Sequence, residues 1–150
     1  MNTAYRVWDG EQMHYWDDEE LSLEITMNEW ILWRDFGDGC RVSVAESHEE
    51  GTALMWGTGL KDKNGNMIYE GDILKRTVTV VLIDSGKPPK DIVEYMKVEY
   101  REDYAGFFIG ERPLLAYVDN THDVDTGCRC TKPEVIDNIN RNPELLEGAE

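Results

Sequence analysis

The chain has 150 residues, of which 41% are hydrophobic and 31% charged, as expected for one globular domain or a domain with a smaller lobe. No apolar run approaches the roughly 20 residues that a membrane-spanning helix needs, and the first residues lack an export-signal pattern, so we expect a cytoplasmic protein with no membrane partner. The formal net charge of −16 disfavours direct binding to nucleic acid and favours partners with a basic surface.

Negative charge and tryptophan are concentrated near the start of the chain. Residues 1–57 contain 13 acidic and 3 basic residues, a net charge of −10, whereas residues 58–150 contain 18 and 12, a net charge of −6. All five tryptophans precede residue 57. We therefore predict an acidic, tryptophan-rich β lobe over residues 1–57 and a second part over residues 58–150, with one continuous domain as the alternative.

The first 57 residues contain short β patterns separated by turn signals. Residues 5–15 alternate β-forming side chains around Asp9-Gly10, a dipeptide that favours a hairpin turn. Residues 21–25 and 40–45 alternate apolar and polar side chains, which predicts two strands that each bury one face. Residues 28–36 fit a strand or a helical turn equally well.

The middle of the chain predicts a hairpin followed by further strands. Apolar residues flank Asn64-Gly65, a pair that suits the two positive φ angles of a type I′ turn. The β-branched run over residues 72–83 predicts a long strand, and the prolines within residues 84–91 predict a loop. Residues 95–110 predict a strand, a turn and a strand, and residues 113–118 predict another short strand.

The last part of the chain predicts a loop, a strand and one turn of helix. Residues 119–132 are polar and acidic, residues 134–139 fit a strand, and Pro143 suits a first helical position. Together these patterns predict a mainly-β protein: a small bent sheet or SH3-like barrel over about residues 58–140, an N-terminal β lobe and little helix.

Three residues near the end of the chain are weak candidates for metal ligands. His122, Cys128 and Cys130 lie within nine positions, and each residue type can bind zinc. A structural zinc site takes four ligands and usually separates paired cysteines by two to four residues, so a loop with two incidental thiols is the favoured interpretation. An odd number of cysteines without an export signal indicates reduced thiols.

The same loop has a partial resemblance to a calcium-binding loop. Asp123, Asp125 and Glu134 have the spacing of three calcium ligands, but Cys128 stands where such a loop requires glycine. We therefore assign no ion to residues 119–132.

No catalytic residue and no cofactor is predicted. The glycine-rich motifs of phosphate-binding loops are absent from the sequence. Tryptophans surrounded by acidic residues are expected in the core, and Trp30 and Trp33 become candidates for a protein interface where they are exposed.

Three patches of the sequence carry a family resemblance: "YRVWD…MHYW", "LMWGTGLKDKNGNMIYEGDIL" and "EVIDNINRNPELLEG". On these patches the chain resembles the YopX family, small proteins encoded mainly by bacteriophages and prophages. The resemblance implies a mainly-β fold and a phage or prophage origin, and it implies no biochemical activity. Residues 87–91 and 119–132 depart from the family pattern and look like insertions.

These observations lead to three hypotheses of function. The first is a non-enzymatic phage accessory protein that assembles with itself as a homo-oligomer or binds a host protein. The second is an acidic mimic of nucleic acid that occupies the basic groove of a host protein. The third is a hydrolase or metal enzyme without a recognisable motif.

Overall fold

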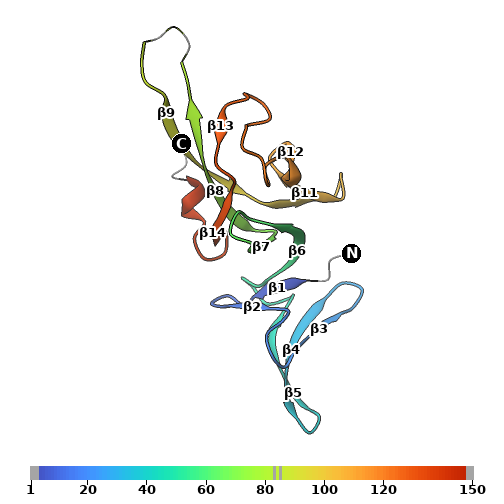
Figure 1. Cartoon of the computed structure of the whole chain (residues 1–150). Coiled ribbons are helices and arrows are strands. Elements are labelled where there is room, and N and C mark those ends of the chain that lie inside the picture. Colours follow the sequence, from blue (N-terminus) through green and yellow to red (C-terminus); the bar gives the residue numbers. More distant parts are fainter. Residues whose placement is uncertain (1–3, 83, 85, 148–150) are drawn as a thin grey trace. The chain divides into compact units, whose positions relative to one another are not determined.

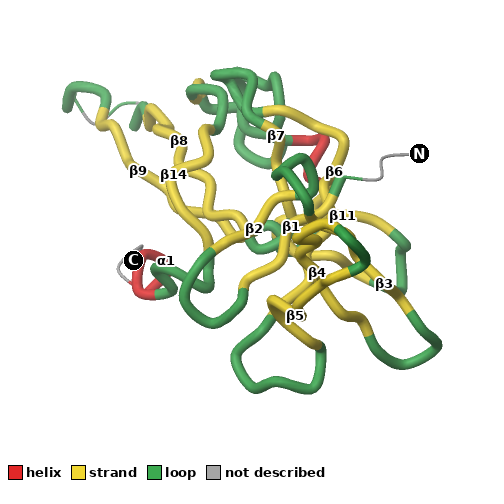
Figure 2. The backbone as a smooth tube through the Cα atoms, turned by 90° about the horizontal axis from the view of Figure 1, so that it is seen from below, coloured by secondary structure: helices red, strands yellow, loops and turns green. Residues whose placement is uncertain are grey.

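The computed structural model describes residues 4–82, 84 and 86–147, and Figures 1 and 2 show that strands and loops dominate this part of the chain. Helix in the described residues is confined to the 3-10 turn η1 (Leu114–Ala116) and the helix α1 (Glu144–Glu147). The predicted mainly-β class is therefore confirmed. Neither helical segment is long or apolar enough to cross a bilayer.

The chain divides into two compact units, residues 1–57 and 58–150. The strands of the first unit, ending with one that continues into the second, are β1 (Tyr5–Trp8), β2 (Met13–Tyr15), β3 (Leu21–Ile25), β4 (Trp30–Gly37), β5 (Cys40–Glu46) and β6 (Ala53–Lys61). Within this unit β1 pairs with β2 and with the first half of β6, while β3, β4 and β5 form a separate antiparallel sheet. The segment that fitted strand or helix equally is thus the strand β4.

The first unit has a small core built from both of its sheets. Val7, Leu32 and Ala45 are fully buried there, and partly buried neighbours include Trp30 and Leu54. The predicted hairpin at Asp9-Gly10 is present as the β1–β2 pair. In its turn the Asp9 carboxylate accepts the backbone N–H groups of Glu11 and Gln12. The alternation predicted for residues 21–25 therefore reflects one face turned towards this core.

The second unit is built around one long strand. Its elements are β7 (Met67–Tyr69), β8 (Asp72–Val80), β9 (Lys90–Lys97), β10 (Glu99–Arg101), β11 (Gly106–Ile109), β12 (Arg112–Pro113), η1, β13 (Arg129–Cys130), β14 (Glu134–Asn138) and α1. One edge of β8 pairs with β9 along its whole length, and the other edge pairs with β14 and then with β13. A three-stranded sheet of β10, β11 and β12 completes the unit.

The core of the second unit lies against the inner face of β8. Leu74 and Val98 are fully buried there and pack with Ile68, Met96, Ile109, Leu114 and Val118. Because alternate strand residues share a face, Leu74, Arg76 and Val78 form one inward row, and all three are buried. A charged residue is therefore placed inside the fold by the strand register.

The turn before β8 is bonded to the chain on both sides. Gly71 has a φ of +84°, which glycine adopts at little cost; its N–H donates to the Val98 carbonyl at 2.8 Å, and its own carbonyl accepts the Ile139 N–H at 2.9 Å. The buried Asp72 carboxylate accepts the Tyr69 N–H at 2.8 Å. The Glu70-Gly71-Asp72 stretch thus fixes a corner of the scaffold.

The central hairpin is present, but its predicted turn type is wrong. Gly65 has a φ of +83°, whereas Asn64 has no positive φ, and the Gly65 N–H donates to the Asp62 carbonyl at 3.0 Å. This is a type I turn from Asp62 followed by a left-handed glycine. The Asp62 side chain selects it, because its carboxylate accepts the N–H groups of Asn64 and Asn66 at 2.9 and 2.8 Å.

Several predicted boundaries also differ from the structure: the strand predicted over residues 72–83 ends at Val80, and the short strand β13 lies within the loop predicted over residues 119–132. The strand predicted over residues 113–118 is wrong beyond Pro113, because η1 follows. Leu114 and Val118 are both buried while Leu115 is exposed, and burial four residues apart fits a helical turn better than alternation. The predicted loop over residues 84–91 ends earlier, since β9 begins at Lys90.

Candidate functional site

The two candidate interface tryptophans lie on opposite faces of the β3–β4–β5 sheet. Trp30 shares the inner face with Leu32 and packs against the core of the first unit. Trp33 is three residues further along β4, an odd spacing that turns it to the outward face. There the Arg41 guanidinium carbon lies 4.0 Å from the centroid of the Trp33 ring, so of the two candidates Trp33 is the one on a surface.

The most exposed tryptophans are others, which the sequence did not single out. Trp16 is 47% exposed and Trp56 is 37% exposed, with the Trp56 ring edge-on to Tyr5 at 6.3 Å between centroids. Trp8 is buried and Trp30 packs against the core, so the expectation of core packing holds for these two tryptophans. The outward direction of Trp33 follows from the alternation of side chains along its strand. Trp16 lies just after the end of β2, where alternation does not predict the direction of a side chain.

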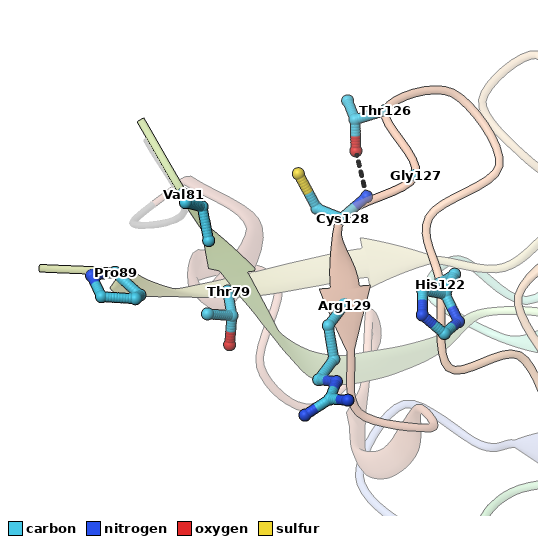
Figure 3. A pocket seen from close by; sticks show the side chains of 8 residues that line it. All are labelled: Thr79, Val81, Pro89, His122, Thr126, Gly127, Cys128 and Arg129. Atoms are coloured by element: carbon cyan, nitrogen blue, oxygen red, sulfur yellow. Dashed lines mark hydrogen bonds between the residues drawn. The ribbon is translucent and has the colours of Figure 1, made fainter. Parts of the chain in front are cut away.

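The candidate metal ligands His122, Cys128 and Cys130 do not converge. Cys130 is buried, and in Figure 3 the His122 ring and the Cys128 sulfur lie on opposite sides of the β13 ribbon. Among the described residues no three His, Cys, Asp or Glu side chains gather closely enough to hold a metal ion.

An open concavity of about 590 Å³ lies beside these residues (Figure 3). Its lining comes from the two arms of the β8–β9 hairpin and from the loop before β13: Thr79, Val81, Pro89, His122, Thr126, Gly127, Cys128 and Arg129. Both segments that look like insertions contribute to it. Two of its hydroxyl groups are already engaged, since the Thr79 hydroxyl donates to Asp91 at 2.7 Å and the Thr126 hydroxyl accepts the Cys128 N–H at 3.2 Å.

A buried charged cluster is centred on Arg76. Its Nε donates to a Glu94 carboxylate oxygen at 2.8 Å, and its Nη2 donates to an Asp123 oxygen at 2.6 Å. The guanidinium also lies 3.6 Å from the Cys130 sulfur and 5.0 Å from the centroid of the Tyr117 ring. A buried guanidinium requires such partners, and here they use all of its sides.

The Arg76 cluster fixes the loop before β13. The hydrogen bond from Arg76 lowers the pKa of Asp123 to about 2, against the opposing effect of burial and with the help of bonds from Thr126. The second Asp123 oxygen accepts the N–H groups of Asp125 and Thr126 and the Thr126 hydroxyl. Because both oxygens are occupied, Asp123 serves as a structural anchor and not as the first ligand of a calcium loop.

The three histidines each contact a different partner, and the Cys130 thiol belongs to the Arg76 cluster. His14 lies 2.8 Å from an Asp9 oxygen, His48 lies 3.3 Å from a Glu46 oxygen, and His122 pairs with the hydroxyl of the preceding threonine. Burial raises the pKa of the Cys130 thiol, although the nearby guanidinium opposes this shift. A buried thiol with a raised pKa is a poor nucleophile, so this cluster is suited to stabilising the fold.

The surface of the first unit is strongly acidic. Of its 13 acidic residues, 11 are exposed and the other two are half-buried. Arg6 is buried and Arg34 is half-buried, so Arg41 is the one exposed arginine or lysine among the described residues of this unit. Burial of the basic side chains thus makes the surface more one-sided than the composition indicates.

Comparison with known proteins gives a consistent result. The family model described as "YopX protein" matches residues 4–147. The SPbeta prophage-derived uncharacterized protein YopX of Bacillus subtilis (strain 168) is 40% identical over 151 residues, covering 99% of this chain and 98% of that protein.

Two solved structures share the fold. The crystal structure of protein yopX from Bacillus subtilis has a TM-score of 0.60 and 34% identity, covering 97% of this chain and 99% of that chain. Protein EF1440 from Enterococcus faecalis has a TM-score of 0.51 and 24% identity, covering 95% of this chain and 96% of that chain. The second similarity concerns the fold alone.

Proposed function

This chain belongs to the YopX family, and from that premise we propose that it is a phage or prophage accessory protein that acts without catalysis in the bacterial cytoplasm. It binds a second copy of itself or a protein of the host. The prophage origin of the relative from Bacillus subtilis supports this setting.

The proposal depends on one observation: large apolar side chains are exposed at the ends of four hairpins. They are Ile25 and Met27 at β3–β4, Phe36 and Val42 at β4–β5, Val81, Leu82, Ile92 and Val93 at β8–β9, and Tyr100 and Tyr104 at β10–β11. Hairpin ends normally carry polar residues, so neighbouring apolar side chains exposed at one hairpin end suggest a contact surface.

The β8–β9 hairpin, labelled in Figure 1, carries the largest of these four sets of exposed apolar side chains. Ile92 and Val93 are neighbours on β9 and point to opposite faces, yet they are 42% and 43% exposed. The β9 arm is therefore partly uncovered on both faces, although Val78, opposite Ile92 on the β8 arm, is buried. Such a ribbon gains stability when a partner covers one of its faces.

The test combines light scattering after gel filtration with capture by the immobilised full chain from bacterial lysate. Any captured protein is then identified, purified and bound back to the chain. We expect self-association or a specific partner, weakened by Phe36→Ser, Val93→Ser or Tyr104→Ser.

Val124→Ser is the matched control, because Val124 is 42% exposed but lies in the loop before β13. A monomer at high concentration that retains no purified partner would exclude the proposed function. Equal weakening by Val124→Ser would exclude a special role for the hairpin ends.

The acidic surface of the first unit favours a second candidate, a mimic of nucleic acid. The 11 exposed carboxylates would attract the groove of a basic host protein, and that attraction falls as salt screens it. A host nucleic-acid-binding protein should then be captured at low salt and released by competing DNA. Capture that DNA does not disturb would reject this candidate and leave the first intact.

A further inference from the structure

The outward face of the β3–β4–β5 sheet places an aromatic ring among carboxylates. In the sheet register Trp33 is opposite Ser22 on β3 and Ser43 on β5, so both of its cross-strand neighbours have small side chains. The next row holds Glu24 and Glu46 on either side of Ile31. We call this surface, with Asp35 and Arg41 in the row beyond, the Trp33 face.

A cation of the chain itself occupies this face. The Arg41 guanidinium carbon is 4.0 Å from the Trp33 ring centroid, and its Nη2 is 3.9 Å from a Glu24 carboxylate oxygen. Arg41 is on β5 and Glu24 is on β3, so the arginine side chain reaches across the ring on β4. Its side chain is 45% exposed and that of Glu24 is 44% exposed.

Arg41 is held weakly enough to be displaced. Exposed ion pairs and exposed cation–π contacts are individually weak, because water competes for both partners. The Trp33 face carries the carboxylates of Glu24, Asp35 and Glu46 against this single guanidinium, which leaves an excess of negative charge. The face therefore favours an additional cation over an additional anion.

The Trp33 indole provides a further unsatisfied group. Its Nε1–H is buried and has no hydrogen-bond acceptor among the described residues. A docked segment that brings a backbone carbonyl to this N–H would supply the acceptor. A buried donor without an acceptor is costly, so satisfying it would add to the affinity.

We propose that the Trp33 face binds an arginine-rich segment of a partner protein, with one partner guanidinium replacing Arg41 over the Trp33 ring. The inference builds on the proposed function, because it names the chemistry of the partner and the residues that contact it. Arginine fits better than lysine, since its planar group stacks on an indole while donating to carboxylates at its edge.

The test is a titration of the ¹⁵N-labelled full chain with a capped hexaarginine peptide, followed through the five indole resonances. We expect the Trp33 resonance to shift most, and hexalysine to bind more weakly. Removing the Glu24 carboxylate by Glu24→Gln should weaken binding about threefold to tenfold. Arg41→Ala should strengthen it by a similar factor, because the internal competitor is gone.

Two control variants separate this site from the general negative field. Glu11→Gln removes an exposed carboxylate of the same unit in the β1–β2 turn, and Lys90→Ala removes an exposed cation of the second unit. Each should change the dissociation constant less than twofold. Effects of Glu24→Gln and Arg41→Ala no larger than those of the controls would overturn the inference, as would a Trp33 resonance that does not move.

The outcomes also separate this inference from the proposed function. A partner captured by the full chain and retained by Glu24→Gln and Arg41→Ala with unchanged affinity refutes the Trp33 face as its site, while the proposed function stands. Selective hexaarginine binding at Trp33 by a chain that stays monomeric and captures no protein supports the site and refutes the proposed function. Both variants alter exposed side chains, so folding is checked by their unchanged indole spectra away from Trp33.

Discussion

Replacement of Asp62 by alanine tests the role of the central hairpin. Asp62 is 7% exposed, and its carboxylate accepts the N–H groups of Asn64 and Asn66 in its own turn. It also accepts the Val135 N–H at 2.9 Å, which connects the hairpin to β14. Three backbone donors therefore lose their acceptor in the variant.

The size of the effect follows from where those donors lie. A hydrogen bond to a charged group contributes about 1.5–3 kcal/mol. The two N–H donors in the turn can bond to water once the carboxylate is removed, so their loss costs less than this full amount. We expect Asp62→Ala to lower the free energy of unfolding of the second unit by about 2–4 kcal/mol. Asp62→Asn should cost about half as much, because its amide keeps one acceptor oxygen.

The assay uses the uneven distribution of aromatic residues. All five tryptophans lie in residues 1–57, so tryptophan fluorescence in urea follows the first unit. Hydrogen exchange of the amides of residues 64–66 and 135, read by mass spectrometry, follows the second. Glu102→Ala is the control, since it removes an exposed carboxylate from the same unit and should change stability by less than about 0.5 kcal/mol.

Acid provides a second readout of the same variant. Burial alone would raise the pKa of Asp62, but the hydrogen bonds from Val135, Asn66 and Asn64 outweigh it and lower the pKa. The Asp62 contribution is therefore present above the pKa of the unfolded chain and is lost as the pH falls through the folded pKa. Equal exchange in Asp62→Ala and Glu102→Ala at neutral pH would refute the reasoning.

Three further predictions concern the second unit. Because the pKa of Asp123 is lowered to about 2, Asp123→Asn should be about 2 kcal/mol less stable than the parent at pH 7, and the difference should shrink between about pH 5 and pH 2 in urea titrations. Arg76→Met should cost about 3 kcal/mol by leaving Asp123 without its cation, and Arg76→Met combined with Asp123→Ala should cost less than the sum of the single changes, as a double-mutant cycle would show. Gly71→Ala forces a side chain into a left-handed conformation and should cost about 1–2 kcal/mol in the same assay, whereas no loss would mean that the turn can rearrange.

Local chemistry made part of the fold predictable. The hairpins at Asp9-Gly10 and Asn64-Gly65 follow from short-range turn preferences, and the strand β14 follows from its apolar pattern. The error in turn type also has a local cause, because Asp62 stands at the first position of the turn and glycine at the fourth, the pattern of a type I turn. Asp62 at the first position is therefore the residue that predicts the type I turn.

Long-range contacts made the rest unpredictable. Asp123 is 47 positions from Arg76, and their pairing depends on how a long loop folds over β8. The alternation of β8 predicts that Arg76 points inward. A charged residue in an inward row requires buried partners of opposite charge, but the alternation does not predict which residues they are. The stacking of Arg41 on Trp33 depends on a bulge in β5, since β4 pairs Leu32 with Ala45 but Trp33 with Ser43.

The strand β6 has a practical consequence for dissecting this protein. Its first residues pair with β1 in one unit, it passes Gly59 at a φ of +82°, and its last residues pair with β7 in the other. A boundary drawn between residues 57 and 58 would cut strand β6 in two and give each fragment a frayed end. Fragments that both retain residues 53–61 would keep the whole strand, and they are the appropriate halves for assigning a binding activity to one unit.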